Sequence, residues 1–281
     1  MERFTGCAPA HICALFRDGC CGYVEMVNSR GIYLQLAGKH ILLCHSRFGT
    51  VPNGASVAQW ERLPSLLTQG EPIRLEKGIL YLSSGALEMQ LLSIPKDTRV
   101  RLPEATSFRL GLETLLAQAK PTGLSSLVYP LFTGQRCSLN PYCETAIPHV
   151  RELLQALQTE NTDMIYLSVC ALLGLGPGLT PSGDDLLSGL LYGLRHSPAR
   201  DSLVCTYLTE AIRSLAGERT NAVSADYLLA LTEDAPFDRM AAAWADPAAG
   251  AAGLLQIGNH SGGEMLLGLL CAGSLQSLFH P

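Results

Sequence analysis

The chain has 281 residues, of which 47% are hydrophobic and 16% are charged, so it can form a substantial core and lacks the composition of a disordered protein. Residues 1–146 carry 14 Lys and Arg against 11 Asp and Glu, a balance of +3, whereas residues 147–281 carry 6 against 14, a balance of −8. An acidic C-terminal half repels nucleic acid and anionic lipid, so we expect neither nucleic-acid nor membrane partners.

The ten cysteines favour a reduced, cytoplasmic protein. Cys170, Cys205 and Cys271 lie inside leucine-rich helical patterns, where a free thiol packs as a small hydrophobic group. The first residues mix acidic and basic side chains and break their apolar run early, which disfavours a secretory signal. Cys137 and Cys143 lack the spacing of zinc-binding pairs, and we predict no metal site.

The first hundred residues read as short strands separated by turns. Residues 23–27, 31–38 and 40–46 are rich in β-prone side chains, and residues 73–84 predict two further strands with a turn at Lys77–Gly78. Regularly spaced short strands indicate a small barrel or sandwich. We therefore predict a β-rich N-terminal domain over residues 1–105.

The remaining sequence is predominantly helical. Residues 106–120 have helical periodicity, and residues 121–143 have little, so we predict a helix and a long connection over residues 106–145. Residues 146–281 predict an all-α bundle, and the chain as a whole is assigned to the α+β class. Its helices are expected at residues 150–159, 164–176, 184–196, 201–217, 221–232 and 263–275.

The stretch GLGPGLTPSGDD, residues 174–185, contains more glycines, prolines and polar side chains than the start of a helix requires. Its glycines permit positive φ angles and close backbone approach, and Ser182 or Thr180 is expected to cap the following helix, with Asp185 completing a capping box. On a helical wheel the leucines cover one face, while Asp185, Tyr192 and His196 lie on the other. We therefore predict a functional loop.

The same pattern occurs a second time near the C-terminus. Residues 182–191 (SGDDLLSGLL) align without gaps on residues 261–270 (SGGEMLLGLL), with six of ten positions identical. Between the two copies, Thr220 or Asn221 can cap a third helix. Three helix N-termini with free backbone N–H groups could converge on one pocket and favour an anion or a carboxylate there.

Two aspartates in the same turn repel a phosphate, which leaves two interpretations open. Either Mg²⁺ or an amide or ammonium group mediates, so that Mg²⁺ is a candidate cofactor, or the aspartates act as acceptors and base while backbone N–H groups hold the anion. We predict Asp184 and Asp185 as catalytic residues. The predicted substrate-binding residues are Gly176, Gly178, Thr180, Ser182, Gly183, Thr220, Asn221, Ser224, His260, Ser261 and Glu264.

These residues resemble a bacterial family formerly of unknown function that is typified by AllH, a subunit of oxamate carbamoyltransferase in anaerobic allantoin degradation. The resemblance is carried by GLGPGLTPSGDD, by TN..S..YL from Thr220, and by GNHSGGEMLLG from Gly258, and it is strongest over residues 174–273. The chain reads Asn259–His260 where the family more commonly has a hydrophobic residue and serine, which leaves the role of His260 open.

The resemblance implies a transferase that acts on oxamate and carbamoyl phosphate, giving oxalurate and phosphate or the reverse, in purine catabolism. It also implies two protein partners, an FdrA-like and an AllG-like subunit. Two other interpretations remain: a non-catalytic subunit whose glycine loop docks a partner, and a small-molecule kinase, since the loop is superficially similar to a glycine–serine phosphate loop. No lysine follows this loop, which disfavours the kinase.

Overall fold

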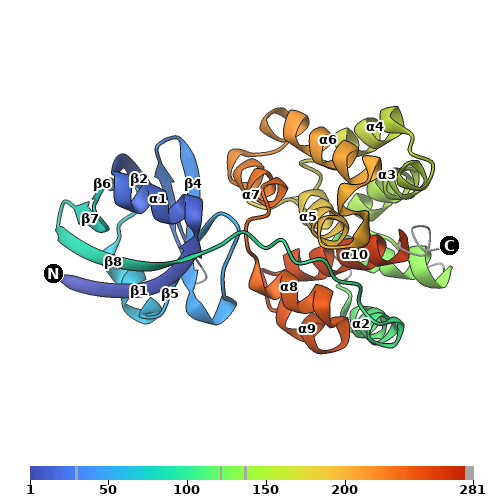
Figure 1. Ribbon diagram of the computed structural model, residues 1–281, viewed down its shortest axis with the longest axis horizontal. Coiled ribbons are helices and arrows are strands. Elements are labelled where there is room, and N and C mark those ends of the chain that lie inside the picture. The colour runs from blue at the N-terminus through green and yellow to red at the C-terminus, as the bar shows by residue number, and fades with distance from the viewer. Residues whose placement is uncertain (29–30, 121, 136–137, 276–281) are drawn as a thin grey trace. The chain divides into compact units, whose positions relative to one another are not determined.

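The computed structural model describes residues 1–28, 31–120, 122–135 and 138–275. The chain forms two compact units, one made of residues 1–97 and 233–238 and the other of residues 98–232 and from 239 onward. The first unit is a closed eight-stranded barrel and the second is helical, so the predicted α+β class is confirmed (Figure 1). None of the described helices is both long enough and apolar enough to span a lipid bilayer.

The barrel closes by pairing its first strand with its last. Its strand order is β1-β5-β4-β3-β2-β6-β7-β8, and the β1–β8 and β4–β5 pairs are parallel while the others are antiparallel. The strands are β1 (Glu2–Pro9), β2 (Cys20–Val27), β3 (Gly31–Leu36), β4 (Lys39–His45), β5 (Gly54–Val57), β6 (Pro72–Glu76), β7 (Ile79–Leu82) and β8 (Gly85–Ile94).

Alternating side chains fill the interior of the barrel. Ile32, Leu34 and Leu36 of β3 are fully buried, as expected for a strand with one face toward a core. Helix α1 (Ala10–Asp18) adds Ile12 and Phe16 to the same hydrophobic cluster. Short 3₁₀ helices, η1 (Ser46–Phe48) and η2 (Trp60–Leu66), connect the strands around it. Strands β1, β5 and β8 and helix α1 are not evident from the sequence pattern.

The helical unit contains nine α-helices in its described part. They are α2 (Ala105–Gln118), α3 (Pro141–Gln158), α4 (Thr162–Leu172), α5 (Ser182–Arg195), α6 (Leu203–Arg219), α7 (Ala222–Thr232), α8 (Asp238–Ala245), α9 (Pro247–Leu254) and α10 (Ser261–Leu275). Asp238, the first residue of α8, groups with the barrel. Short turns η3 (Leu124–Leu127), η4 (Tyr129–Thr133) and η5 (Pro198–Asp201) complete the unit.

The expected long connection at 121–143 therefore holds short helical turns and the start of α3, with residues 121 and 136–137 outside the described part. Helices α8 and α9 are additions to the predicted set. Every cysteine that the structure describes is free, and Cys137 lies outside those residues.

Helices α5 and α10 form the centre of this unit and pack side by side (Figure 1). A Cβ on Gly189 would lie 2.0 Å from the carbonyl oxygen of Met265, and a Cβ on Gly268 would lie 2.1 Å from that of Leu186. Residue numbers rise together along the contact, because Gly193 meets Ala272 one turn further on. The two helices are therefore parallel, and both glycines are required for their close approach.

The helix pair buries more of α5 than its pattern suggested. Every residue from Ser182 to Leu194 is buried, including Asp185 and Tyr192, and His196 just beyond the helix is 3% exposed. The expected polar face therefore does not reach solvent, because neighbouring helices cover both sides of α5. The rings of Tyr192 and His196 stack on each other, and the His196 ring is hydrogen-bonded through Nδ1 to the carbonyl oxygen of Tyr192.

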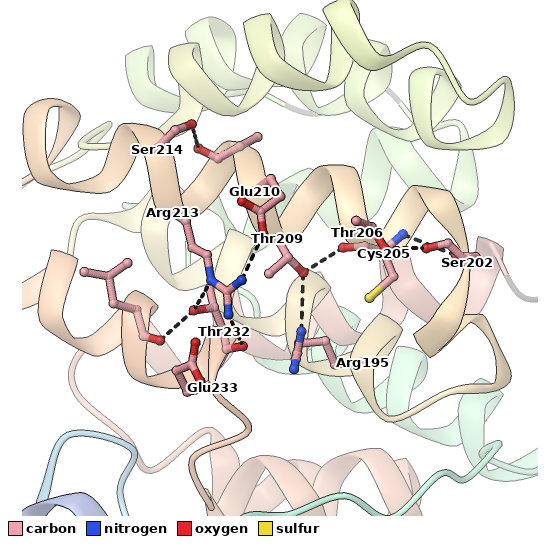
Figure 2. Close-up of polar contacts among 12 residues, drawn as sticks. Arg195, Ser202, Cys205, Thr206, Thr209, Glu210, Arg213, Ser214, Thr232 and Glu233 are labelled. Carbon is pink, nitrogen blue, oxygen red and sulfur yellow. Dashed lines mark hydrogen bonds and ion pairs between the residues drawn. The ribbon is translucent and has the colours of Figure 1, made fainter.

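Polar contacts fix α6 against the ends of its neighbours (Figure 2). The guanidinium of Arg213 donates to the hydroxyl and the carbonyl oxygen of Thr232, at the end of α7, and also to Glu210. Arg195, at the end of α5, donates to the hydroxyl of Thr209 at 3.5 Å. These contacts hold α5, α6 and α7 together, and the α6–α7 junction contributes to the site described below.

Candidate functional site

The glycine loop before α5 uses its glycines for specific backbone conformations. Gly174, Gly176 and Gly178 have φ angles of +76°, +112° and +103°, which L-residues rarely adopt. A Cβ on Gly176 would lie 2.9 Å from the backbone nitrogen of Ser182, and one on Gly174 would lie 2.3 Å from the carbonyl oxygen of Arg219. The loop therefore folds back against the start of α5.

Helix α5 begins differently from the expectation. Pro181 occupies the N-cap position, and neither Ser182 nor Thr180 caps the helix with its side chain, so the predicted capping box is wrong. The amides of Asp184 and Asp185 donate to the carbonyl oxygen of Pro181, and the amide of Gly183 donates to that of Leu175. Backbone carbonyls thus satisfy the amides that a capping side chain would otherwise bind.

Backbone carbonyl oxygens also accept the first amides of α10. The Gly262 amide donates to the carbonyl oxygen of Ile257, and the amides of Gly263 and Glu264 donate to that of His260. Among the described amides of residues 182–185 and 261–264, those of Ser182 and Ser261 have no backbone acceptor. The expectation of several free N–H groups at each of these two helix starts was therefore wrong, and one remains at each.

The two helix starts lie next to each other, joined by their hydroxyl groups. Thr180 Oγ1 lies 3.2 Å from Ser261 Oγ, a hydrogen bond between segments 81 residues apart. The hydroxyl of Ser182, at the start of α5, lies close enough to the carboxylate of Glu264 on α10 to lower the pKa of that carboxyl group. The sequence predicted that each serine would act within its own helix, but Ser182 instead reaches the acid of the other helix.

Asp185 is the most enclosed acid of the site. It is 1% exposed, and both carboxylate oxygens lack a hydrogen-bond partner among the described residues. Burial raises its pKa well above 3.8, and the nearby negative charge of Glu264 raises it further. The hydroxyls of Ser261 and Thr180 favour the ionised form, although neither reaches hydrogen-bond geometry with it. A buried carboxyl group without a partner is available to bind or transfer a proton.

Glu264 is buried in a similar place on α10. It is 1% exposed, and its Oε1 accepts the backbone N–H of Leu124 at 2.8 Å. Burial raises the pKa of Glu264, whereas the nearby Ser182 hydroxyl, the Leu124 N–H and His260 lower it. A Cβ on Gly123 would lie 2.5 Å from Glu264 Oε1, so the segment that begins η3 covers this carboxyl group closely.

Asp184 has a different environment from its neighbour. Its Oδ1 accepts the Gly174 amide at 2.7 Å, and its Oδ2 accepts the hydroxyls of Ser224, at 2.6 Å, and Thr220. Burial raises its pKa, and these three donors oppose that effect. Asp184 therefore ties the glycine loop and the α6–α7 junction to the start of α5, with its acceptor positions occupied.

The third helix start also meets this site. Asn221 Oδ1 accepts the Ser224 amide at 3.1 Å, so Asn221 is the cap of α7, one of the two expected for it. Because Ser224 and Thr220 both bind Asp184, the beginning of α7 lies beside the beginning of α5. The structure thus brings the three predicted helix starts together.

A segment that the sequence did not suggest lies over the start of α10. Lys120 Nζ donates to the backbone oxygen of Asn259 and, at 3.1 Å, to its Oδ1. Thr122 Oγ1 lies 3.3 Å from His260 Nε2, and His260 Nδ1 is buried without a hydrogen-bond partner among the described residues. These contacts join residues nearly 140 positions apart, so no local pattern could have indicated them.

Not all of the predicted site residues lie around the two helix starts. Gly178 is exposed, with open space where a Cβ would project, and Asn221 is an exposed cap. No group of three or more His, Cys, Asp or Glu side chains in the described ranges is arranged to hold a metal ion. The residues that meet around the two helix starts are Gly176, Thr180, Ser182, Gly183, Asp184, Asp185, Thr220, Ser224, His260, Ser261 and Glu264.

The segment that carries these helix starts matches a known protein family. Residues 172–273 match the family model described as oxamate carbamoyltransferase subunit AllH. The match begins at the end of α4, includes the starts of α5, α7 and α10, and confirms the resemblance predicted from the sequence. No curated protein and no solved structure shows a match to the chain.

Proposed function

We propose that this chain takes a direct part in carbamoyl transfer between carbamoyl phosphate and oxamate, at the adjoining starts of α5 and α10. Support comes first from position, since the family match over residues 172–273 contains both helix starts and the junction before α7. The description of that family names a subunit, and we propose that the partners of this chain are FdrA-like and AllG-like proteins in a cytoplasmic assembly of purine catabolism.

The observation that carries the proposal is the burial of the Asp185 carboxyl group away from hydrogen-bond donors. Its carboxyl group is buried without a hydrogen-bond partner among the described residues, beside the hydroxyls of Thr180 and Ser261. An unpaired buried carboxylate is costly for a fold, and a structural role would normally provide donors for it, as Asp184 has. The raised pKa brings Asp185 closer to the operating pH, where a general base is most effective.

The reaction requires one proton acceptor at the amide nitrogen of oxamate. In the forward direction this nitrogen attacks the carbonyl carbon of carbamoyl phosphate, an N–C bond forms, and the bond from that carbon to the phosphate oxygen breaks. The nitrogen loses one proton, which we assign to Asp185, and the products are oxalurate and phosphate. An amide is a weak nucleophile, so removal of this proton as the bond forms lowers the barrier.

Asp184 has a positioning role in this proposal. The donors from Gly174, Thr220 and Ser224 occupy its oxygens, so it holds the loop and the start of α7 in place. The predicted catalytic pair is thereby divided into one base and one residue that orients its surroundings. The close backbone approach at Gly176 and Gly183 sets the position of Ser182 against Glu264.

Both substrates are anions, and the acids at the start of α5 repel them. We propose that Lys120, Thr122 and His260, at the start of α10, bind the anionic group, together with the Ser261 amide. Lys120 has three N–H donors, of which Asn259 takes two. Mg²⁺ is the other means of neutralising the substrate, and turnover after dialysis against EDTA distinguishes the two.

Reconstitution tests the function directly. The purified chain is mixed with its FdrA-like and AllG-like partners, and oxalurate and phosphate formed from carbamoyl phosphate and oxamate are quantified. We expect product only when all three proteins are present. Product formation that continues when this chain is omitted would show that it is dispensable for the reaction, in agreement with the docking interpretation.

A further inference from the structure

Lys120 fixes the orientation of the Asn259 side chain. Its ammonium group donates to the backbone oxygen of Asn259 and, at 3.1 Å, to Asn259 Oδ1. An ammonium group carries only donors, so the atom that faces it must be the amide oxygen and cannot be the amide nitrogen. The amide nitrogen Nδ2 is therefore left to contact the neighbouring His260.

The Asn259 amide in turn fixes the position of the hydrogen on the His260 ring. Asn259 Nδ2 lies 2.9 Å from His260 Nε2, and because an amide NH₂ group only donates, Nε2 must be the acceptor. A ring nitrogen that accepts carries no hydrogen, so the hydrogen of the neutral imidazole is on Nδ1. The Thr122 hydroxyl, 3.3 Å from the same Nε2, can likewise act only as a donor to it.

The Nδ1–H group of His260 is left without an acceptor. Nδ1 is buried and has no hydrogen-bond partner among the residues that the structure describes. Gly123 lies against this ring, since a Cβ on it would be 3.2 Å from His260 Cβ and Cγ, and a glycine has no side chain that could accept. The nearby acid Glu264 has its Oε1 occupied by the Leu124 N–H. Buried donors nearly always have an acceptor, so this one indicates the oxygen of a ligand.

Two further donors at the start of α10 are not fully used. The Ser261 amide, directly after His260, has no backbone acceptor in the described part of the chain. Lys120 has three N–H donors, of which Asn259 takes two. A carboxylate or a phosphate offers several lone pairs together with a negative charge, and it therefore satisfies such a set of donors better than a neutral or a cationic group does.

We propose that Asn259 is a positioning residue that sets the tautomer of His260, so that His260 Nδ1–H donates to an oxygen of the anionic substrate. The binding role rests on the proposed carbamoyl transfer, in which that oxygen belongs to the carboxylate of oxamate or to the phosphate of carbamoyl phosphate. The other tautomer would direct a lone pair of Nδ1 at this oxygen and repel it. Lys120 contributes to the same selection, because it orients the Asn259 amide.

The tautomer can be measured without turnover. NMR of the full-length chain, labelled with ¹⁵N in its histidine rings, distinguishes protonated from unprotonated ring nitrogens at about pH 8.5, two units above the ordinary pKa of imidazole. The His260→Asn variant, which lacks the signals of this ring, assigns them.

We expect the wild-type ring to carry its hydrogen on Nδ1 and to have an unprotonated Nε2. In Asn259→Asp a carboxylate oxygen replaces the amide N–H, so Nε2 should gain a hydrogen. Lys120→Gln is the matched control, because its amide can still donate to Asn259 Oδ1 and Nε2 should stay unprotonated. A wild-type ring with its hydrogen on Nε2, or an Nε2 that stays unprotonated in Asn259→Asp, would overturn the positioning role. If Asn259→Asp does not fold, the wild-type ring decides.

The donor role is tested in the reconstituted complex with two variants of His260. The short side chain of His260→Asn can place an N–H near the position of Nδ1, whereas the longer one of His260→Gln places it near Nε2. His260→Gln should raise the KM for one anionic substrate about tenfold to 100-fold, and His260→Asn should remain closer to wild type. The substrate affected, oxamate or carbamoyl phosphate, shows whether a carboxylate or a phosphate is bound.

A role in packing alone predicts the reverse order, because asparagine leaves the larger cavity. Equal KM values for the two variants, or a higher one for His260→Asn, would overturn the donor role. If the complex transfers no carbamoyl group, the proposed function fails, and the labelled full-length chain decides the donor role instead. Addition of oxamate or of inorganic phosphate should then shift the His260 Nδ1 signal, and no shift with either anion would overturn it.

Discussion

Gly189 of α5 and Gly268 of α10 occupy equivalent places in the contact between their helices, each against the backbone carbonyl that lies three residues before the other glycine. The spacing between Gly189 and Gly268 is the same 79 residues that separates the two sequence repeats. This contact fixes the distance between the two helix starts, and with it the distance between Asp185 and Glu264. The stability of the contact can be tested independently of any activity.

We predict that Gly189→Ala lowers the free energy of unfolding by about 1–3 kcal/mol, because its Cβ would lie 2.0 Å from the carbonyl oxygen of Met265 and the helices must separate. The matched control is Gly217→Ala in α6, where a Cβ meets nothing within 4 Å. That substitution should stabilise by about 0.5–1 kcal/mol through helix propensity. Urea unfolding followed by circular dichroism measures both, and equal effects would contradict the close contact.

Asp184→Ala should destabilise the helical unit by about 2–4 kcal/mol, since it removes the acceptor of three donors, two of them side chains of the α6–α7 junction. Thr220→Val deletes one of these donors and should cost about 1 kcal/mol. Thermal unfolding at constant pH compares the variants. A fully stable Asp184→Ala would mean that the loop and α7 are held by other contacts.

Asp185 should make stability depend on pH in a definite direction. Its folded-state pKa is raised well above the 3.8 of the unfolded chain, so the native state binds more protons, and stability falls as pH rises from about 4 toward the folded pKa. Asp185→Asn removes this penalty. We expect the variant to gain stability relative to wild type as pH increases over that window.

Chemical unfolding at a series of pH values measures this gain for Asp185→Asn. Asp246 provides a control, because its pKa is lowered, by the Ser107 hydroxyl first, and it is an exposed cap of α9. The Asp246→Asn difference should have the opposite sign, with the variant losing stability relative to wild type as pH rises toward about 4. A gap between wild type and Asp185→Asn that does not change with pH would rule out a raised pKa at this position.

Lys120→Gln should raise the KM for an anionic substrate about tenfold in the reconstituted complex, because it removes a positive charge beside His260 while keeping a donor for Asn259. An effect on oxamate indicates a carboxylate at this position, and an effect on carbamoyl phosphate indicates its phosphate. Lys39→Gln, which alters an exposed lysine of the barrel, should leave both KM values unchanged. Equal KM values for Lys120→Gln and wild type would remove Lys120 from the proposed site.

The sequence predicted the barrel only where its strands alternate strongly. Strand β8, with GALEMQLLSI, is built largely of helix-forming residues, and its pairing with β1 overrides that preference. Strand β5 is only GASV, too short to produce a pattern. Helices α8 and α9 are rich in Ala and Gly and lack the leucine periodicity that revealed the others.

The local sequence likewise predicted only part of the candidate site. The repeat at 182–191 and 261–270 indicated two similar helix starts, because similarity of sequence is visible without coordinates. The capping role of Ser182 was wrong, because its hydroxyl meets Glu264 on the neighbouring helix instead of its own backbone. Lys120 and Thr122 could not be found, since only tertiary packing brings them to Asn259 and His260.

We propose that Asp185 accepts a proton during carbamoyl transfer, and the rate constant kcat of the Asp185→Asn complex tests this role most directly. Asparagine keeps the size of the side chain and cannot accept that proton, so kcat should fall by about 100-fold to 10,000-fold with little change in KM, in a protein that folds as well as wild type. A folded Asp185→Asn complex that turns over at the wild-type rate would contradict the account.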